Sequence, residues 1–214
     1  MIDQETQTAR PKFRRRAEAR PDEVLDSALD LFIESGFAAT RVEDIAAAAG
    51  ISKGAVYLYF PSKQAILEAL VRRAIVPMVD SASVLAMVPQ GNPVATITAI
   101  LDGLVRRLAE PRNAAIPRLI MIEAGSFPDL AAMYRTEVID RAFAILTTLI
   151  RRGIAEGHIR AVDPELAVRN IAGPIFINVL MTEVFGFAAP DPADFAASHA
   201  DILLNGLVAR PGAA

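Results

Sequence analysis

The chain has 214 residues, enough for one or two domains, and a formal net charge of −3. It contains no cysteine, which excludes disulfides, thiolate metal sites and cysteine nucleophiles. No uncharged apolar run approaches the roughly 20 residues that span a bilayer, and the N-terminus does not resemble a signal peptide. We therefore expect a cytoplasmic protein with no membrane partner.

Positive charge is concentrated near the N-terminus. Between Arg10 and Arg20 there are six basic residues and one acid, and all three lysines lie in the first 63 residues. From position 74 onward eleven arginines face fourteen acidic residues. Because binding to a polyanion depends on Lys and Arg, the N-terminal part is the candidate for nucleic-acid contact. Residues 1–20 are predicted to be a basic, flexible arm, either a solvated tail or a contact to DNA.

The pattern of apolar residues, prolines and glycines predicts an all-α fold of about nine helices. A first helix opens at Pro21 and ends at Gly36, and a second is capped by Thr40, with Glu43 completing a capping box. Ser52 caps a third helix, residues 53–60. A fourth helix runs from Lys63 towards Pro77 or beyond, and the remaining predicted helices cover residues 94–109, 114–124, 128–156, 164–187 and 192–208.

The segment from Val42 to Tyr59 has the spacing of a helix-turn-helix. Gly50 permits the positive backbone angle of the tight turn, and Ala46 is small where the two helices cross. The residues expected to face the core are Ile45, Ala49, Ile51, Val56 and Tyr59. In such a motif the second helix enters the major groove, so its exposed face would carry Lys53, Gly54, Ala55 and Tyr57.

These residues resemble the signature of the TetR family of transcriptional regulators over about residues 22–68. The resemblance lies in Leu31-Phe32, Gly36-Phe37, Thr40, Ile45-Ala46, Gly50-Ile51-Ser52-Lys53-Gly54, Tyr57-Leu58-Tyr59-Phe60 and Lys63. It implies a DNA-binding domain at residues 21–72 and a helical ligand-sensing and dimerisation domain at residues 73–214. It further implies that Thr40 and Arg41 meet DNA at the start of the second helix. Lys53, Gly54, Ala55 and Tyr57 would read the groove, while Tyr59 and Lys63 would hold phosphates. Alternatively, the tyrosines pack in the core and Lys63 is an ordinary surface lysine.

The resemblance also implies dimerisation through the last two helices, residues 164–187 and 192–208, and an effector pocket in the C-terminal domain. The stretch 116–134 resembles sensor domains of regulators of efflux or stress genes. The candidate pocket residues are Met121, Phe127, Met133, Phe143, Phe176 and Met181, with Glu123 and Asn178 as polar anchors. Each of these could equally fill the core, because Met and Phe at helical spacing usually pack.

The predicted function is a ligand-responsive transcriptional repressor, which binds a palindromic operator as a homodimer and is released by a small apolar or amphipathic molecule. A shift of the fourth helix would change the spacing of the recognition helices. An enzyme is disfavoured, because His158 and His199 are the only histidines, they lie far apart in sequence, and no metal or cofactor motif is present. The alternative is a helical protein-interaction module without sequence-specific DNA binding.

Overall fold

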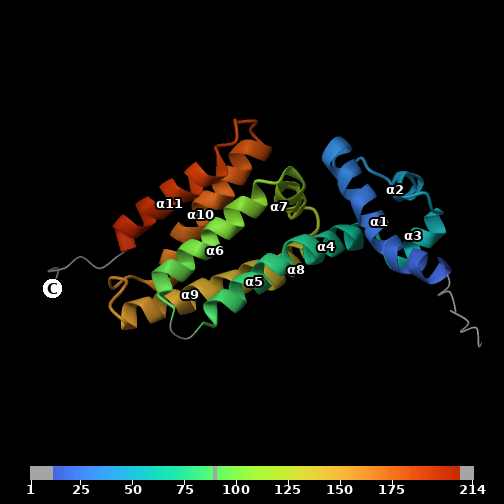
Figure 1. The fold of residues 1–214 in the computed structure, drawn as a ribbon. Coiled ribbons are helices and arrows are strands. Elements are labelled where there is room, and N and C mark those ends of the chain that lie inside the picture. The colour runs from blue at the N-terminus through green and yellow to red at the C-terminus, as the bar shows by residue number, and fades with distance from the viewer. Residues whose placement is uncertain (1–11, 89–90, 208–214) are drawn as a thin grey trace, which may run out of the picture. The chain divides into compact units, whose positions relative to one another are not determined.

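The computed structural model describes residues 12–88 and 91–207 of the chain, and all its elements over these ranges are helical, as predicted. Eleven α-helices and one π-helical turn, labelled η1, follow one another along the chain (Figure 1). The elements are α1 (Lys12–Ser35), α2 (Val42–Ala48), α3 (Lys53–Tyr59), α4 (Lys63–Ala74), α5 (Val76–Ala86), α6 (Pro93–Leu108), α7 (Pro111–Glu123), α8 (Pro128–Tyr134), η1 (Arg135–Ile139), α9 (Asp140–Ala155), α10 (Pro164–Glu183) and α11 (Pro192–Leu207).

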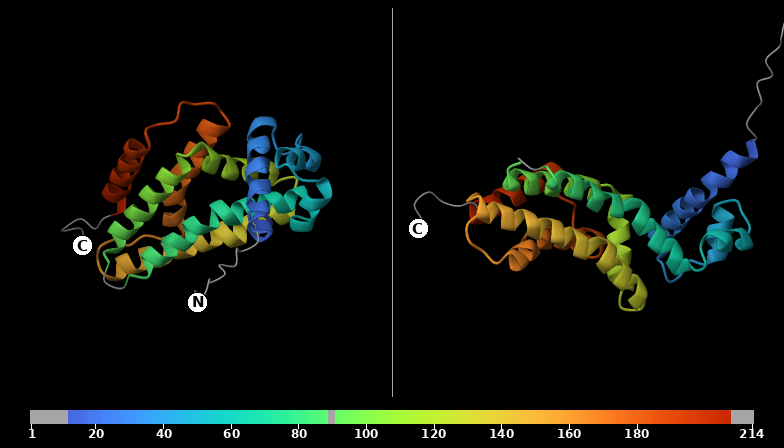
Figure 2. Two further views of the ribbon diagram at one scale, coloured as in Figure 1. Left: turned by 45° about the vertical axis from the view of Figure 1, so that its right-hand side comes forward. Right: turned by 90° about the horizontal axis from the view of Figure 1, so that it is seen from below.

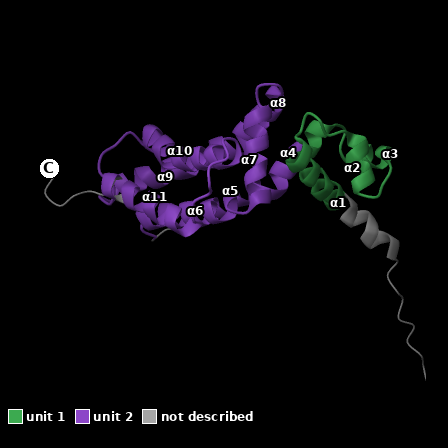
Figure 3. Ribbon diagram, turned by 90° about the horizontal axis from the view of Figure 1, so that it is seen from above, with its two compact units in different colours: residues 1–66 green, residues 67–214 purple. Residues whose placement is uncertain are grey.

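The chain divides into two compact units, residues 1–66 and residues 67–214, coloured separately in Figure 3. We call them the N-terminal unit and the C-terminal unit. The boundary falls inside α4, so this one helix contributes to both units.

The N-terminal unit is a three-helix arrangement in which α1, α2 and α3 contact one another. Phe32 of α1 and Phe37 are buried with their ring centroids 5.1 Å apart. Ile45 of α2 and Val56 of α3 are completely buried. Gly50 has a φ of +66°, which side-chain-bearing residues rarely adopt, so the glycine allows the chain to turn from α2 to α3 within a few residues.

The first helix begins at Lys12, so the predicted start at Pro21 was wrong, and residues 12–20 do not form the irregular arm that we expected. Four of the nine residues in this segment are Arg and two are Ala, and both residue types favour helix. Pro21 lies inside the helix because its fixed φ is close to the helical value, at the cost of the hydrogen bond that its missing N–H would make. Residues 1–11 of the predicted arm lie outside the described residues.

The C-terminal unit is built around α6, α9 and α10, and α9 contacts both of the other two helices (Figure 2). α11 packs on α6, and α5 contacts both α6 and α9. The core residues recur at helical spacing on each of the three central helices. They are Ile97, Leu101 and Val105 of α6, Leu146, Leu149 and Ile150 of α9, and Val168, Ile171 and Ile175 of α10.

Two predicted helices are interrupted, which raises the number from nine to eleven. The fourth predicted helix stops at Ala74 and α5 starts at Val76, because Pro77 cannot donate to the preceding turn. The predicted helix 128–156 is divided by η1, whose wider π-type turn separates α8 from α9. Such turns often occur at functional sites.

Candidate DNA-binding and ligand sites

The third helix directs most of its side chains outward. The Ser52 hydroxyl caps it by accepting a hydrogen bond from the backbone N–H of Ala55 at 3.1 Å, as predicted. Val56 anchors α3 in the core, whereas Lys53 and Tyr57 are exposed, the latter by 43%. The prediction that Tyr59 faces the core was wrong, because its side chain is 37% exposed. α3 therefore presents a surface of Lys53, Gly54, Tyr57, Leu58 and Tyr59, with Ala55 half-buried at its edge.

An ion pair links α3 to α2 on this surface. Lys53 Nζ donates a hydrogen bond to Glu43 Oε1, and it lies 5.8 Å from the centre of the Tyr57 ring. The hydrogen bond lowers the pKa of Glu43 and raises the pKa of Lys53, so both groups stay charged near neutral pH. The positive charge on α3 is therefore balanced by an acid of α2.

The start of α2 differs from the prediction by one residue. Arg41 is the N-cap, and its backbone N–H donates to Asp44 Oδ2 at 3.1 Å, so the predicted box of Thr40 and Glu43 was wrong. Thr40 is 4% exposed, and its hydroxyl donates to the Gly36 carbonyl oxygen at 2.7 Å. The hydroxyl thus stabilises the turn after α1, while Arg41 lies exposed at the start of α2.

Lys63 closes the same turn from the beginning of α4. Its ammonium donates to the carbonyl oxygens of Phe37, of Ala38 at 3.1 Å and of Thr40 at 2.8 Å, and it lies 4.5 Å from the centre of the Phe37 ring. A lysine has three N–H donors, and this arrangement offers an acceptor to each of them. Lys63 therefore ties α4 to the connection between α1 and α2, and a phosphate would have to compete with three carbonyl groups.

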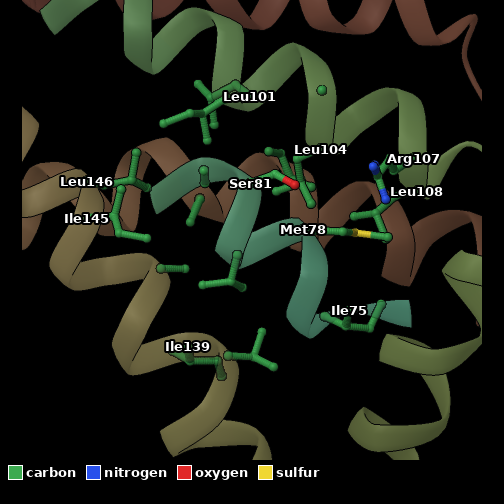
Figure 4. A pocket seen from close by; sticks show the side chains of 18 of the residues that line it. Ile75, Met78, Ser81, Leu101, Leu104, Arg107, Leu108, Ile139, Ile145 and Leu146 are labelled. Carbon is green, nitrogen blue, oxygen red and sulfur yellow. The ribbon is translucent and has the colours of Figure 1, made fainter. Parts of the chain in front are cut away.

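The C-terminal unit encloses an apolar cavity of about 180 Å³ (Figure 4). Its walls come from α5, α6, η1, α9 and α10, and include Met78, Leu104, Leu146 and the aromatic residues Phe143 and Phe176. Tyr134 also lines it, and burial raises the pKa of this phenol to about 12, so the group is neutral at physiological pH.

The predicted pocket residues are divided among several places. Phe143 and Phe176 line the apolar cavity, and Asn178 lines a neighbouring cavity of about 260 Å³ together with Thr182 and Glu183. Those that line neither cavity are Met121, Glu123, Phe127, Met133 and Met181. The sequence reasoning missed the walls supplied by α5 and α6. The apolar residues around Met78 and Leu104 could have indicated these walls, but the same pattern is typical of residues that pack in a core.

The last two helices carry apolar side chains that nothing covers within the described part of this chain. Leu166 and Ile177 of α10 are 59% and 56% exposed, and Ile202 of α11 is 70% exposed. His199, by contrast, is buried, with Nε2 3.0 Å from the carbonyl oxygen of Ile171.

Over residues 12–88 and 91–207 the structure contains no group of three or more His, Asp or Glu side chains that could hold a metal ion. No helix in these ranges is long and apolar enough to cross a membrane.

Comparison with known families agrees with this arrangement in both units. Residues 24–70 match the family described as bacterial regulatory proteins, tetR family, and residues 87–201 match the tetracyclin repressor-like C-terminal domain. The chain belongs to the TetR family. This is a family of transcriptional regulators, which bind DNA and small effectors, and not of enzymes.

Individual proteins are similar to this chain in sequence or in fold. The chain is 31% identical over 174 residues to the uncharacterised HTH-type transcriptional regulator YdeS of Bacillus subtilis. The matched region covers 79% of this chain and 82% of YdeS. The fold is similar to that of SmeT from Stenotrophomonas maltophilia in complex with triclosan, with a TM-score of 0.78, 24% identity and coverage of 91% and 93% of the two chains. It is also similar to that of FadR from Bacillus subtilis in complex with stearoyl-CoA, with a TM-score of 0.74, 21% identity and coverage of 86% and 98%.

Proposed function

We propose that this TetR-family regulator is a repressor that binds a palindromic operator as a homodimer and leaves it when a small effector fills the apolar cavity. The observation that carries the proposal is the outward face of α3. A capped helix anchored by one buried valine presents Lys53, Gly54 and Tyr57 to the outside. This is the form in which a recognition helix enters a major groove.

The DNA contacts follow from the chemistry of the exposed residues. Lys53 and Tyr57 would contact base edges and the groove wall, while Gly54 and Ala55 let the helix approach closely. Arg41 and Tyr59 would hold phosphates on either side. Lys63 and Thr40 would act indirectly, by holding the turn that positions α2.

The proposed dimer interface is the outer face of α10 and α11. Exposed or half-buried apolar residues along α10 and at its C-cap are spaced by three, four or seven positions, which places them on one stripe. They are Leu166, Gly173, Ile177, Leu180 and the C-cap residue Val184. Ile202 adds to this surface from α11. A second copy would cover the same stripe symmetrically in a four-helix interface. A dimer also provides two recognition helices, as a palindromic operator requires.

The cavity is the proposed effector site, since apolar cavities with few polar groups are typical of small-molecule sites. The triclosan complex of SmeT and the stearoyl-CoA complex of FadR support it, because both proteins share this fold and each ligand contains a substantial apolar part.

Occupancy of the cavity would reach α4 through η1. Val138 and Ile139 of η1 line the cavity, and the adjacent Glu137 accepts hydrogen bonds from Arg72 of α4 at distances between 2.8 and 3.1 Å. A ligand that displaces η1 would therefore move or release the end of α4. Because α4 begins at Lys63 in the N-terminal unit, this movement would change how α3 meets the operator.

The test is fluorescence anisotropy with a labelled duplex from upstream of this protein's own gene and a scrambled duplex as control. We expect salt-sensitive preference for the upstream duplex at two chains per site, and dimers in analytical ultracentrifugation. Tyr57→Ala should weaken binding about tenfold, since a good base contact is worth about 1–3 kcal/mol. Arg41→Ala should also weaken binding, through the loss of a phosphate contact. The matched control Arg151→Ala removes an exposed charge from α9 and should have no effect.

Equal, weak binding to both duplexes would call for selection from a random library. If that selection also recovers no preferred sequence, the protein is a helical interaction module and the proposal is wrong.

A further inference from the structure

Arg107 stands out in the wall of the apolar cavity. Among the described residues that line the cavity, it is the one with a formal charge at neutral pH. It lies in the last turn of α6 beside Leu104 and Leu108, at one side of the cluster of labelled side chains (Figure 4). Its side chain is exposed to solvent, which places it at the opening and not at the bottom of the cavity.

The guanidinium of Arg107 has no hydrogen-bond or ion-pair partner among the described residues, although its backbone carbonyl accepts from Asn113 Nδ2 at 3.0 Å. The adjacent Arg106 differs: its Nε donates to Asp102 Oδ2 at 2.8 Å, and this bond raises the pKa of Arg106. A basic residue in the last turn suits the negative end of the helix dipole, which accounts for both arginines. The helix dipole does not explain why Arg107, which lines the cavity, lacks an acidic partner while Arg106 has one.

The other polar groups of the cavity cannot supply a second charge. The Ser81 hydroxyl donates to the Pro77 carbonyl oxygen at 2.7 Å, so it offers a ligand an acceptor and not a donor. Tyr134 is buried and neutral. A ligand that fits this wall therefore needs an apolar body and one anionic end, because a guanidinium binds carboxylates through two parallel hydrogen bonds.

The size of the cavity limits the apolar body. Its volume of about 180 Å³ is somewhat larger than the roughly 150 Å³ engineered cavity that binds benzene. A ring or a medium-length alkyl chain would fill it, and the anionic group would remain at the opening.

We propose that the effector is an amphipathic carboxylate, which places its apolar part in the cavity and its carboxylate on Arg107. The inference rests on the proposed effector role of the cavity and adds the chemical class of the ligand. Arg107 then determines specificity, by favouring the acid over neutral and cationic molecules of the same length.

The test is isothermal titration calorimetry on the full-length protein without DNA, at neutral pH. The probes are decanoate, decanol and decyltrimethylammonium, with octanoate and laurate to cover the chain length. We expect decanoate to bind about tenfold more tightly than decanol, the lower end of what a hydrogen bond to a charged group provides, because the site is exposed. Decyltrimethylammonium should bind more weakly than either.

Arg107→Gln should remove the preference for decanoate and leave the affinity for decanol within about twofold, while Arg107→Lys should keep part of it. The matched control is Arg106→Gln. It removes the same charge from the adjacent position, and Arg106 does not line the cavity. Arg106→Gln should keep the preference for the acid.

Three results would overturn the inference: equal affinity of the wild type for decanoate and decanol, a preference that survives in Arg107→Gln, or an equal loss in Arg106→Gln. In each of these the neutral probe still binds, so the cavity remains an effector site. If none of the probes binds at any chain length, the proposed effector role of the cavity fails as well. DNA binding is measured separately and is not affected by either outcome.

Discussion

Replacing Lys63 with methionine separates two roles for this residue, a contact to a DNA phosphate and a structural clamp within the N-terminal unit. Methionine keeps most of the volume and the contact with the Phe37 ring. It removes the ammonium that donates to the carbonyl oxygens of Phe37, Ala38 and Thr40. These carbonyls follow α1 and precede α2, so the substitution frees the segment that positions the helix-turn-helix.

The three lost hydrogen bonds set the expected loss of folding stability. A hydrogen bond to a charged group contributes about 1.5–3 kcal/mol when it is sheltered. Lys63 is partly exposed, and water can replace some of the lost donors, so we expect a total loss of about 2 kcal/mol. For a chain of this size such a loss lowers the unfolding midpoint by about 4–8 °C.

The assay combines thermal unfolding, followed by circular dichroism, with hydrogen exchange of the backbone amides of α2. Lys63→Met should lower the unfolding midpoint and increase exchange in α2. The control is Lys53→Met, which removes a lysine from the exposed face of α3. Lys53 is exposed and paired with Glu43 at the surface, so its loss should weaken operator binding without a measurable change in stability. The opposite outcome is weaker operator binding by Lys63→Met, with the unfolding midpoint and the amide exchange of α2 unchanged from the wild type. That result would contradict the structural role of Lys63 and support a contact to a DNA phosphate.

Two further predictions concern acidic residues. Glu43→Gln should tighten operator binding about threefold at low salt and less at high salt, because it frees Lys53 and removes a negative charge near the DNA. The control is Glu34→Gln, which removes an exposed acid from α1. Equal effects of the two substitutions would contradict a local cause. The hydrogen bonds from Arg72 lower the pKa of Glu137 in the folded protein. The ionised carboxylate therefore stabilises the fold at pH values above the pKa of an unfolded glutamate, about 4.3. This stabilisation is lost as the pH falls through the lower pKa of the folded state. Wild type should therefore exceed Glu137→Gln in stability at pH 7 by at most about 1 kcal/mol and match it in strong acid, as urea unfolding at several pH values would show; a difference that persists in acid would exclude the ion pair as its source.

Signals within a few residues of one another were sufficient for much of the fold and for the recognition helix. Gly50 at a positive φ, Ser52 as the cap of α3 and Val56 as its buried anchor were all predicted from short spacings, and the structure confirms them. Such features depend on local backbone geometry and on helical periodicity, which neighbouring residues largely determine.

Other features depended on residues far apart in the chain. Thr40 carries a typical capping side chain, but its hydroxyl is turned towards Gly36, and the cap passes to Arg41. Lys63 meets the carbonyl of Phe37 across 26 positions, a contact that no spacing rule predicts. The apolar cavity and the place of Arg107 in its wall arise only when α5, α6, α9 and α10 pack together. Local signals were enough to predict most of the helices, the helix-turn-helix and the family, because periodicity and caps depend on neighbouring residues. Which polar atoms are already hydrogen-bonded, and where a cavity remains, depends on packing between helices that are distant in the chain.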